Sequence, residues 1–391
     1  MNVLQICKKS PLPPKDGESL AIHQITKALV AHGTHVDVVC MLTQKHHEFS
    51  DTSALPNTHY YPIKICTQPS IKGVINNFSK NEPYIVERFY NKDVEDKIVD
   101  LLSRKTYDFI ILEGVFLGLY IDVIKKNTKA KIILRAHNVE HQIWERIAEN
   151  ERNLFKKTYL KKVMNEKFSV FEAEIVKKVD AIVPISPVDE QYFKNISQKP
   201  LLTIPMTVDT VKKEPLPTDF KIGFIGGMDW LPNLKGIKWF LDQVWKPFVQ
   251  EHKEAEFYLA GRNFPKKSSF LNLKGVKVQG EVENAESFLN QLQIVVTPIF
   301  SGSGMRVKII EAMNIGRCVL STSIGAEGIN YTDKENIVIA NTKQEWIDAL
   351  NMLKNNYAKV VEIGNNASAM VQQNYKQNTY ADKLIKFIKE I

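Results

Sequence analysis

Residues 301–313, with the sequence SGSGMRVKIIEAM, bring together small residues, two cations and one carboxylate. The glycines allow the backbone to approach a ligand closely, and the apolar residues that follow recur at helical spacing. The N–H groups at the start of such a helix attract anions. Arg306 and Lys308 add positive charge beside them, and Glu311 can bind hydroxyl groups. This chemistry suits a diphosphate attached to a sugar.

Further glycines stand where predicted strands end and helices begin. Each can bring the backbone close to a ligand or simply form a turn, and the sequence alone leaves both interpretations open. The segments are 10–18 with Gly17, 224–233 with Gly226 and Gly227, 258–263 with Gly261 and Arg262, and 323–328 with Gly325 and Gly328.

His137 directly follows a predicted strand, in the segment 134–140 with the sequence LRAHNVE. A histidine at the carboxyl end of a strand can exchange protons or bind sugar hydroxyls, or it can cap the helix predicted over 139–149. His137 and His141 have the i, i+4 spacing of a metal-binding pair, but no Asp-x-Asp ends a strand. We therefore expect no metal, and the absence of a G-x-S-x-G elbow argues against a serine hydrolase.

Elements that position these residues follow an alternating pattern of apolar strands and helices, which predicts parallel sheets covered on both faces. A chain of 391 residues exceeds one ordinary core, so we expect an α/β fold with two doubly wound, Rossmann-like domains. The predicted domains are 1–205 and 206–374, with a linker at 211–219. The segment 375–391 is expected to form a last helix with an apolar stripe. In such a fold the default site is the cleft between the domains.

The formal net charge is +8, and many of the lysines lie between Lys125 and Lys178. The helix predicted over 152–178 is either a basic face for an anionic membrane or lipid diphosphate, or an ordinary solvated helix. No nucleic-acid-binding signature occurs. Four scattered cysteines, no signal peptide and no membrane-length apolar run predict a cytoplasmic protein, with peripheral contact at the plasma membrane left open.

Several motifs together make the chain similar to retaining glycosyltransferases of family 4, which have the GT-B fold. The resemblance spans nearly the whole chain and implies that the last helix, 375–391, packs back on the first domain. It rests on 32–39 (HGTHVDVV), 204–209 (IPMTVD), 224–227 (FIGG), 301–313 and 325–328 (GAEG). The segment 301–313 together with HNVE at 137–140 resembles a bacterial branch of this family. Members of that branch synthesise cell-surface polysaccharides such as capsule or lipopolysaccharide.

The chain departs from the family at the E-x7-E motif. The second glutamate corresponds to Glu311, expected at the donor ribose, but Ser303 occupies the position of the first. The resemblance then implies that Ser303 and the backbone N–H groups of Gly304 and Met305 contact the donor sugar in place of this glutamate. Gly227 stands where the family usually has an arginine, so the diphosphate cations would be Arg306 and Lys308.

The resemblance implies transfer of a hexose from a nucleotide-diphosphate sugar to a glycan or lipid-linked acceptor, with retention and without a metal or other cofactor. His137 and Glu311 would be the catalytic residues, and Gly17, Gly227 and Gly261 would join the donor site. Two alternatives stay open: a nucleotide-sugar 2-epimerase of the same fold, and a non-catalytic nucleotide-sugar-binding subunit.

Overall fold

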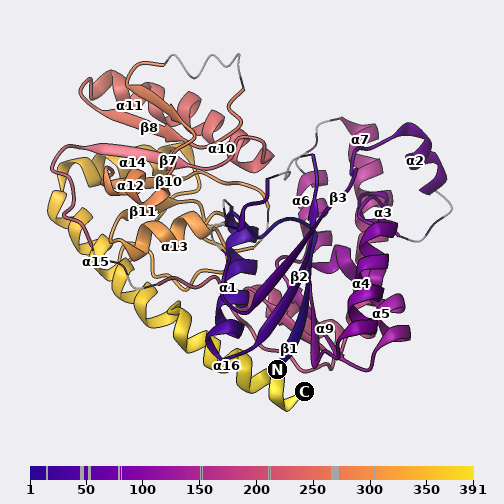
Figure 1. Ribbon diagram of the computed structural model, residues 1–391. Helices are drawn as coiled ribbons and strands as arrows, with labels where there is room; N and C mark the ends of the chain where they lie inside the picture. Colours follow the sequence, from indigo (N-terminus) through magenta and orange to yellow (C-terminus); the bar gives the residue numbers. More distant parts are fainter. Residues whose placement is uncertain are drawn as a thin grey trace. The chain divides into compact units, whose positions relative to one another are not determined.

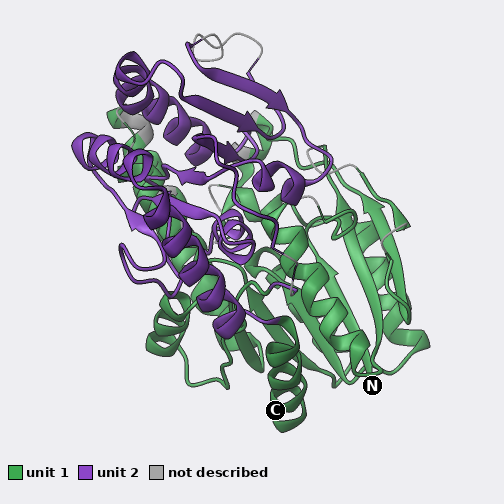
Figure 2. Cartoon of the chain, turned by 90° about the vertical axis from the view of Figure 1, so that its left-hand side faces the viewer, with its two compact units in different colours: residues 1–207, 377–391 green, residues 208–376 purple. Residues whose placement is uncertain are grey.

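The computed structural model describes most of the chain, in two compact units (Figure 2). Unit 1 comprises residues 1–207 and 377–391, and unit 2 comprises residues 208–376. These limits lie two residues from the domain limits expected from the sequence. The described residues are 1–14, 16–44, 48–51, 54–77, 80, 82–149, 151, 153–209, 211, 213–265, 273–302 and 304–391, without the side chains at 71, 74, 75, 155, 156 and 163.

Unit 1 is built on a six-stranded parallel sheet of order β3-β2-β1-β4-β5-β6 (Figure 1). Its strands are β1 (Asn2–Cys7), β2 (His35–Leu42), β3 (Thr58–Lys64), β4 (Phe109–Glu113), β5 (Lys131–Ala136) and β6 (Ala181–Pro184). Its helices are α1 (Gly17–Ala31), α2 (Ile71–Asn77), α3 (Tyr84–Glu87), α4 (Lys92–Arg104), η2 (Val115–Tyr120), α5 (Ile121–Asn127), α6 (Glu140–Glu149), α7 (Leu154–Tyr159), η3 (Leu160–Asn165), α8 (Glu166–Lys178), α9 (Pro187–Ile196) and α16 (Gln377–Glu390).

The apolar runs of the sequence explain the central strands, because side chains on both faces of β1, β4, β5 and β6 are buried. One strand, β3, has no such run: it lies at the edge of the sheet, alternates half-buried and exposed residues, and contains Pro62. An edge strand tolerates proline because one side of its backbone has no neighbour in the sheet. For this reason β3 is not among the strands expected from the sequence.

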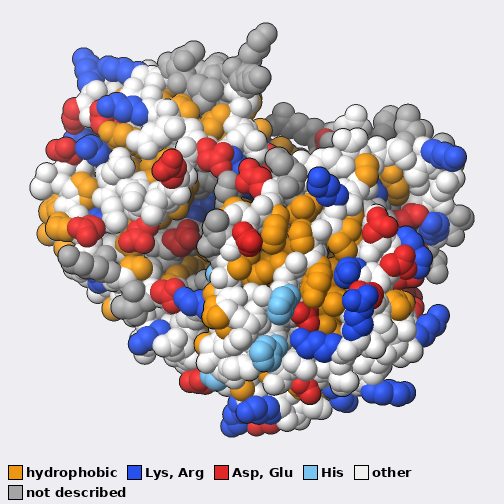
Figure 3. All heavy atoms as spheres, in the orientation of Figure 1, with side chains coloured by type: hydrophobic (Ala, Val, Ile, Leu, Met, Phe, Trp, Pro, Cys, Tyr) orange, Lys and Arg blue, Asp and Glu red, His pale blue; other side chains and the backbone are white. Residues whose placement is uncertain are grey.

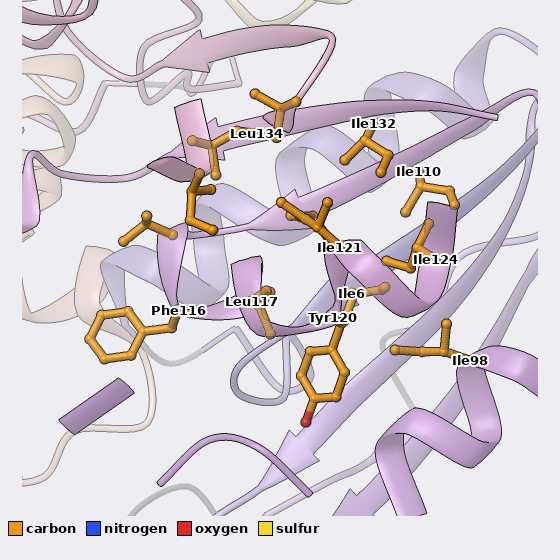
Figure 4. Close-up of a cluster of buried hydrophobic side chains, with 14 of the residues drawn as sticks. Ile6, Ile98, Ile110, Phe116, Leu117, Tyr120, Ile121, Ile124, Ile132 and Leu134 are labelled. Carbon is orange, nitrogen blue, oxygen red and sulfur yellow. The ribbon is translucent and has the colours of Figure 1, made fainter. Parts of the chain in front are cut away.

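One apolar cluster fills the space between the sheet of unit 1 and the helices on one face (Figure 4). Isoleucines of β4 and β5 meet η2 and α5 there, and Tyr120 is fully buried among them. A second cluster joins α1 to α16 on the opposite face, where Leu384 and Ile388 are buried against Ile22 and Leu29. Both faces of the sheet are therefore covered, as a parallel sheet requires.

Unit 2 repeats the plan with a six-stranded parallel sheet of order β12-β11-β10-β7-β8-β9. Its strands are β7 (Lys221–Ile225), β8 (Glu256–Ala260), β9 (Val276–Gly280), β10 (Ile294–Thr297), β11 (Cys318–Ser321) and β12 (Val338–Ile339). Its helices are α10 (Leu231–Phe240), η4 (Leu241–Trp245), α11 (Lys246–Glu251), α12 (Ala285–Asn290), α13 (Val307–Asn314), α14 (Lys343–Asn355) and α15 (Tyr357–Asn374). The expected α/β class with two doubly wound sheets is confirmed.

The basic segment expected as one helix over 152–178 is divided into α7, the π-helical turn η3 and α8. Phe168 and Phe171 are buried in the core of unit 1, so one face of α8 packs inward. On the face of the molecule drawn in Figure 3, lysine and arginine side chains are interspersed with acidic ones. No helix in the described part of the chain is long and apolar enough to cross a membrane.

Candidate functional site

In unit 2 the loops after β7 and β8 lie against each other at the carboxyl ends of the strands. The N–H of Gly226 donates to the carbonyl of Ala260 at 3.0 Å. Gly261 has φ +140°, and a Cβ there would lie 2.0 Å from the carbonyl oxygen of Gly226. Only glycine fits this position. The two glycine segments singled out from the sequence are thus one structural feature.

Gly226 keeps open the space that Lys308 occupies. A Cβ on Gly226 would lie 2.4 Å from Lys308 Nζ and 2.8 Å from Asn233 Nδ2. The next residue, Gly227, faces Asp229, whose Oδ1 would lie 2.7 Å from an added Cβ. These glycines therefore make room for polar side chains as well as for a tight turn.

The segment before α13 changes direction through two glycines in the left-handed region, Gly302 with φ +102° and Gly304 with φ +82°. Ser303, between them, lies outside the described residues. Arg306 is the N-cap residue of α13 rather than part of its first turn, and no side-chain hydrogen bond caps the helix. Its guanidinium is buried, donates to the carbonyl of Gly304, and lies 5.4 Å from the Trp230 ring centre.

Lys308 is the centre of this cluster. Its Nζ donates to Asn233 Oδ1 at 3.0 Å and lies 4.0 Å from the ring centre of Phe224. The amide of Asn233 in turn donates to the carbonyl of Gly227 at 2.8 Å. Asn233 thus ties α13 to the loop after β7.

Lys308 is not the fixed cation expected from the sequence. Burial lowers the pKa of its ammonium group to about 7, and nearby Arg306 adds to this effect while Glu311 opposes it. The side chain is therefore charged only in part at neutral pH. A bound anion would favour the charged form of Lys308, so Lys308 would take up a proton when the anion binds.

Glu311 lies one turn further along α13. Burial raises the pKa of its carboxyl group, Glu286 contributes in the same direction, and Lys308 counteracts both. Met305, just before α13, is 8% exposed. The structure thus brings Gly227, Gly261, Gly304, Met305, Arg306, Lys308 and Glu311 to one edge of the sheet in unit 2.

Arg262 lies beside Gly227, where an added Cβ would be 3.5 Å from Arg262 Nε. Its Nε lies 4.0 Å from Asp229 Oδ1, and the backbone carbonyl of Arg262 accepts the N–H of Met228 at 3.0 Å. Both side chains keep more than a quarter of their area exposed. Such a pair is weak in water, so it does little to compensate the charge of Arg262.

His137 and Gly17 belong to unit 1. His137 follows β5 and is 6% exposed, and its Nε2 lies 2.7 Å from Glu113 Oε2, at the end of β4. The other oxygen of Glu113 accepts from Gln5 Nε2 at 2.6 Å, and Gln5 Oε1 accepts from the hydroxyl of Thr26 at 2.7 Å. A continuous buried chain of hydrogen bonds thus runs from α1 to His137.

This chain fixes how His137 can act. Both oxygens of Glu113 are acceptors when the group is ionised, so Nε2 of His137 must donate. In the neutral ring Nδ1 is then the acceptor. His137 does not cap α6 through this bond; it is held as an oriented imidazole.

Gly17 is the first residue of α1, and the preceding Asp16 caps the helix through a reciprocal pair of hydrogen bonds with Ser19. Two lysines that follow β1 reach the same helix end: Lys9 pairs with Asp16, and Lys8 lies 3.2 Å from Glu18. Burial alone would raise the pKa of Glu18, but Lys8, Lys9 and His137 hold it at about 2. The Gly17 loop is therefore packed with compensated charges.

The metal pair considered from the sequence does not form. His141 Nδ1 lies 2.7 Å from Glu172, on α8, whereas His137 pairs with Glu113. Each histidine thus has its own carboxylate. Within the described ranges no group of three or more His, Cys, Asp or Glu side chains could hold a metal ion.

The sequence alone did not identify Glu113 or Phe224 as part of the site, nor the hydrogen bonds of Asn233 to Lys308 and Gly227. Glu113 ends an apolar strand, and a carboxylate in that position was a signal for a buried polar partner. Phe224 reads as an ordinary core residue, and its contact with Lys308 follows only from the three-dimensional packing.

Residues 219–356, which lie within unit 2, match the family described as "Glycosyl transferases group 1". The whole chain is similar to a Klebsiella pneumoniae protein described as an "Uncharacterized 44.6 kDa protein in cps region", at 22% identity over 399 residues, with 98% of this chain and 99% of that protein covered.

Solved structures share the fold over the full length. Sucrose-phosphate synthase from Thermosynechococcus elongatus superposes with a TM-score of 0.75 at 14% identity, covering 100% of this chain and 99% of that one. A TarM variant from S. aureus, in complex with fondaparinux, α-GlcNAc-glycerol and UDP, gives 0.70 at 13%, covering 99% of both chains. HepE from Anabaena in complex with UDP gives 0.68 at 13%, covering 100% of both. The architecture is therefore the GT-B fold.

Proposed function

We propose that the protein is a glycosyltransferase that uses a nucleotide-diphosphate sugar. One observation carries the proposal: in unit 2 a glycine-lined edge holds Arg306, Lys308 and the start of α13 together, with Glu311 on the same helix. Cations and free backbone N–H groups at a helix start suit a diphosphate. The match of residues 219–356 to group 1 glycosyltransferases supports the same conclusion.

Within this proposal Lys308 and Arg306 bind the diphosphate, and Glu311 binds the ribose hydroxyls. Gly226, Gly227 and Gly261 let the backbone approach the donor, and the N–H groups of Gly304 and Met305 serve the sugar together with Ser303. UDP-bound relatives of the same fold, TarM and HepE, support a nucleotide sugar as donor. The panel of nucleotide sugars described below would identify the base and the sugar of the donor.

We assign His137 to sugar binding in unit 1, where Nδ1 would accept a hydrogen bond from a sugar hydroxyl. The reaction breaks the bond between the anomeric carbon and the diphosphate oxygen and forms a bond to the acceptor oxygen. The acceptor's proton passes to the leaving diphosphate, whose charge Arg306 and Lys308 stabilise. We further propose that the enzyme retains the configuration at the anomeric carbon, uses a glycan or lipid-linked acceptor and needs no metal. The Klebsiella relative in a cps region supports a role in cell-surface polysaccharide synthesis.

Donor binding should weaken as the pH rises above about 7. Lys308 has its lowered pKa only without the anion, and a bound diphosphate raises it. Binding is therefore strongest below pH 7 and falls by up to about tenfold per pH unit above it. The diphosphate of a nucleotide sugar keeps its charge over this range, so calorimetric titration of a nucleotide sugar at several pH values measures the effect of the protein. A flat profile would contradict the role of Lys308.

A panel of UDP-, GDP- and ADP-sugars tests the function itself. We expect one base to raise the melting temperature of the full chain, because a ligand of the native state stabilises it. The same nucleotide sugar should be consumed only with an acceptor, and NMR of the new glycosidic bond should show the anomeric configuration of the donor. Release of an epimerised free sugar without acceptor would identify an epimerase instead. Binding without turnover on any acceptor would identify a non-catalytic subunit.

A further inference from the structure

Arg135 is a buried cation in unit 1 that the proposed reaction does not use. It lies in β5 beside β6 and is 2% exposed. Its Nη1 donates to the carbonyls of Val183 and Pro184, both at 3.2 Å. Among the described residues its Nε has no acceptor. Its guanidinium has five N–H donors, and most of them are left for another partner.

Neighbouring carboxylates do not supply that partner. Glu113 and Asp189 act on Arg135 only through space, and both oxygens of Glu113 are bound by Gln5 and His137. Asp189 accepts from Ser186. Burial lowers the pKa of Arg135 to about 10, so the side chain is still charged at neutral pH. Arg135 thus has carboxylates near it but no direct ion pair among the described residues, and a buried charge without a direct partner is costly.

A small cavity opens beside this guanidinium. Its polar lining comes from Arg135, Gln24, Thr207 and Gln377, and the rest of the lining is mainly apolar. Gln377 is the first residue of α16, a helix of 14 residues, so the positive end of the helix dipole faces the same space. The cavity volume of about 10 Å³ is the room of one water-sized sphere.

We propose that this cavity binds one small inorganic anion of the size of chloride, held by Arg135 and the start of α16. The cavity lining contains no acidic side chain, so an anion in it would touch the guanidinium and no carboxylate. A neutral water molecule in the cavity would leave Arg135 without a directly bound counter-ion.

The cavity lies where the chain leaves and re-enters unit 1, so a bound anion would affect how these two segments are held. Residues 204, 205 and 207 line it just before the chain passes from unit 1 to unit 2, and Gln377 lines it where the chain returns. A bound anion would therefore link the two crossing segments within unit 1. It should stabilise unit 1 whether or not a nucleotide sugar is present, so this inference stands independently of the proposed function.

Thermal unfolding of the full chain tests the site. We expect potassium chloride to raise the melting temperature by about 2 °C or more over potassium gluconate at equal ionic strength, as expected for a ligand of the native state. Crystals soaked in bromide should show an anomalous peak beside Arg135. No chloride dependence, or no bromide at Arg135, would overturn the proposal and leave a water molecule in the cavity.

A matched pair of variants separates this site from general salt effects. Arg135→Gln should lose the difference between chloride and gluconate. Arg317→Gln should keep it, because Arg317 is equally buried but donates to Asn290 at 2.7 Å and to the carbonyl of Glu214, in unit 2. Equal loss in both variants would contradict a specific site. If Arg135→Gln does not fold, the bromide measurement on the unmodified protein still decides.

Discussion

Lys308→Met should weaken nucleotide-sugar binding by about 100-fold, because it removes a charge-assisted contact to the diphosphate. The same change should raise the melting temperature of the ligand-free protein. Lys308 is half-buried, and desolvation lowers the pKa of its ammonium group to about 7, below its usual value. Its charged form thus destabilises the fold, and this cost disappears with the ammonium group. Calorimetric titration and thermal unfolding measure the two effects.

Lys235→Met is the matched control for this change, since Lys235 is an exposed lysine of α10 in the same unit. It should alter neither the affinity nor the melting temperature. Loss of stability in Lys308→Met together with unchanged nucleotide affinity would show that Lys308 serves packing through Asn233 and Phe224 instead of anion binding.

Glu113→Gln should lower kcat by about 10- to 100-fold, with a much smaller effect on KM for the donor. The amide can no longer hold Nε2 of His137 as an ionised carboxylate does, so the ring loses its fixed tautomer and orientation. The pH profile of kcat should change as well. Nitrogen-15 NMR of His137 reports the tautomer directly, independent of any substrate.

Glu172→Gln provides a comparison, because the buried Glu172 and the half-buried His141 form a second carboxylate–imidazole pair at 2.7 Å in unit 1. Disturbing it should cost stability but leave the pH profile of kcat unchanged. An equal loss of kcat in both variants, without a change in the His137 tautomer, would mean that Glu113 acts only on the fold.

The sequence predicted the two doubly wound sheets because central parallel strands are buried on both faces and appear as apolar runs. The glycines near 226 and 261 and the cations near 306 were also identifiable, since their residue types restrict what they can do. The edge strand β3 escaped because its side chains alternate and include Pro62.

Properties that depend on packing could not be predicted. The lowered pKa of Lys308 follows from its burial near Phe224 and Arg306, which lie 84 and two positions away in the chain. The pairing of His137 with Glu113 joins neighbouring strands, β4 and β5, that are separated in the sequence by a helical connection. The expected role of Ser303 stays a prediction, because that residue lies outside the described part of the chain.

The central claim is that unit 2 binds the diphosphate of a nucleotide sugar at the ends of β7 and β8 and the start of α13. Hydrogen–deuterium exchange of the full chain with the nucleotide sugar identified in the panel tests it most directly. We predict slower exchange in peptides covering residues 225–230 and 304–310, and loss of this protection in Lys308→Met. Protection confined to other segments, with binding intact, would contradict the claim.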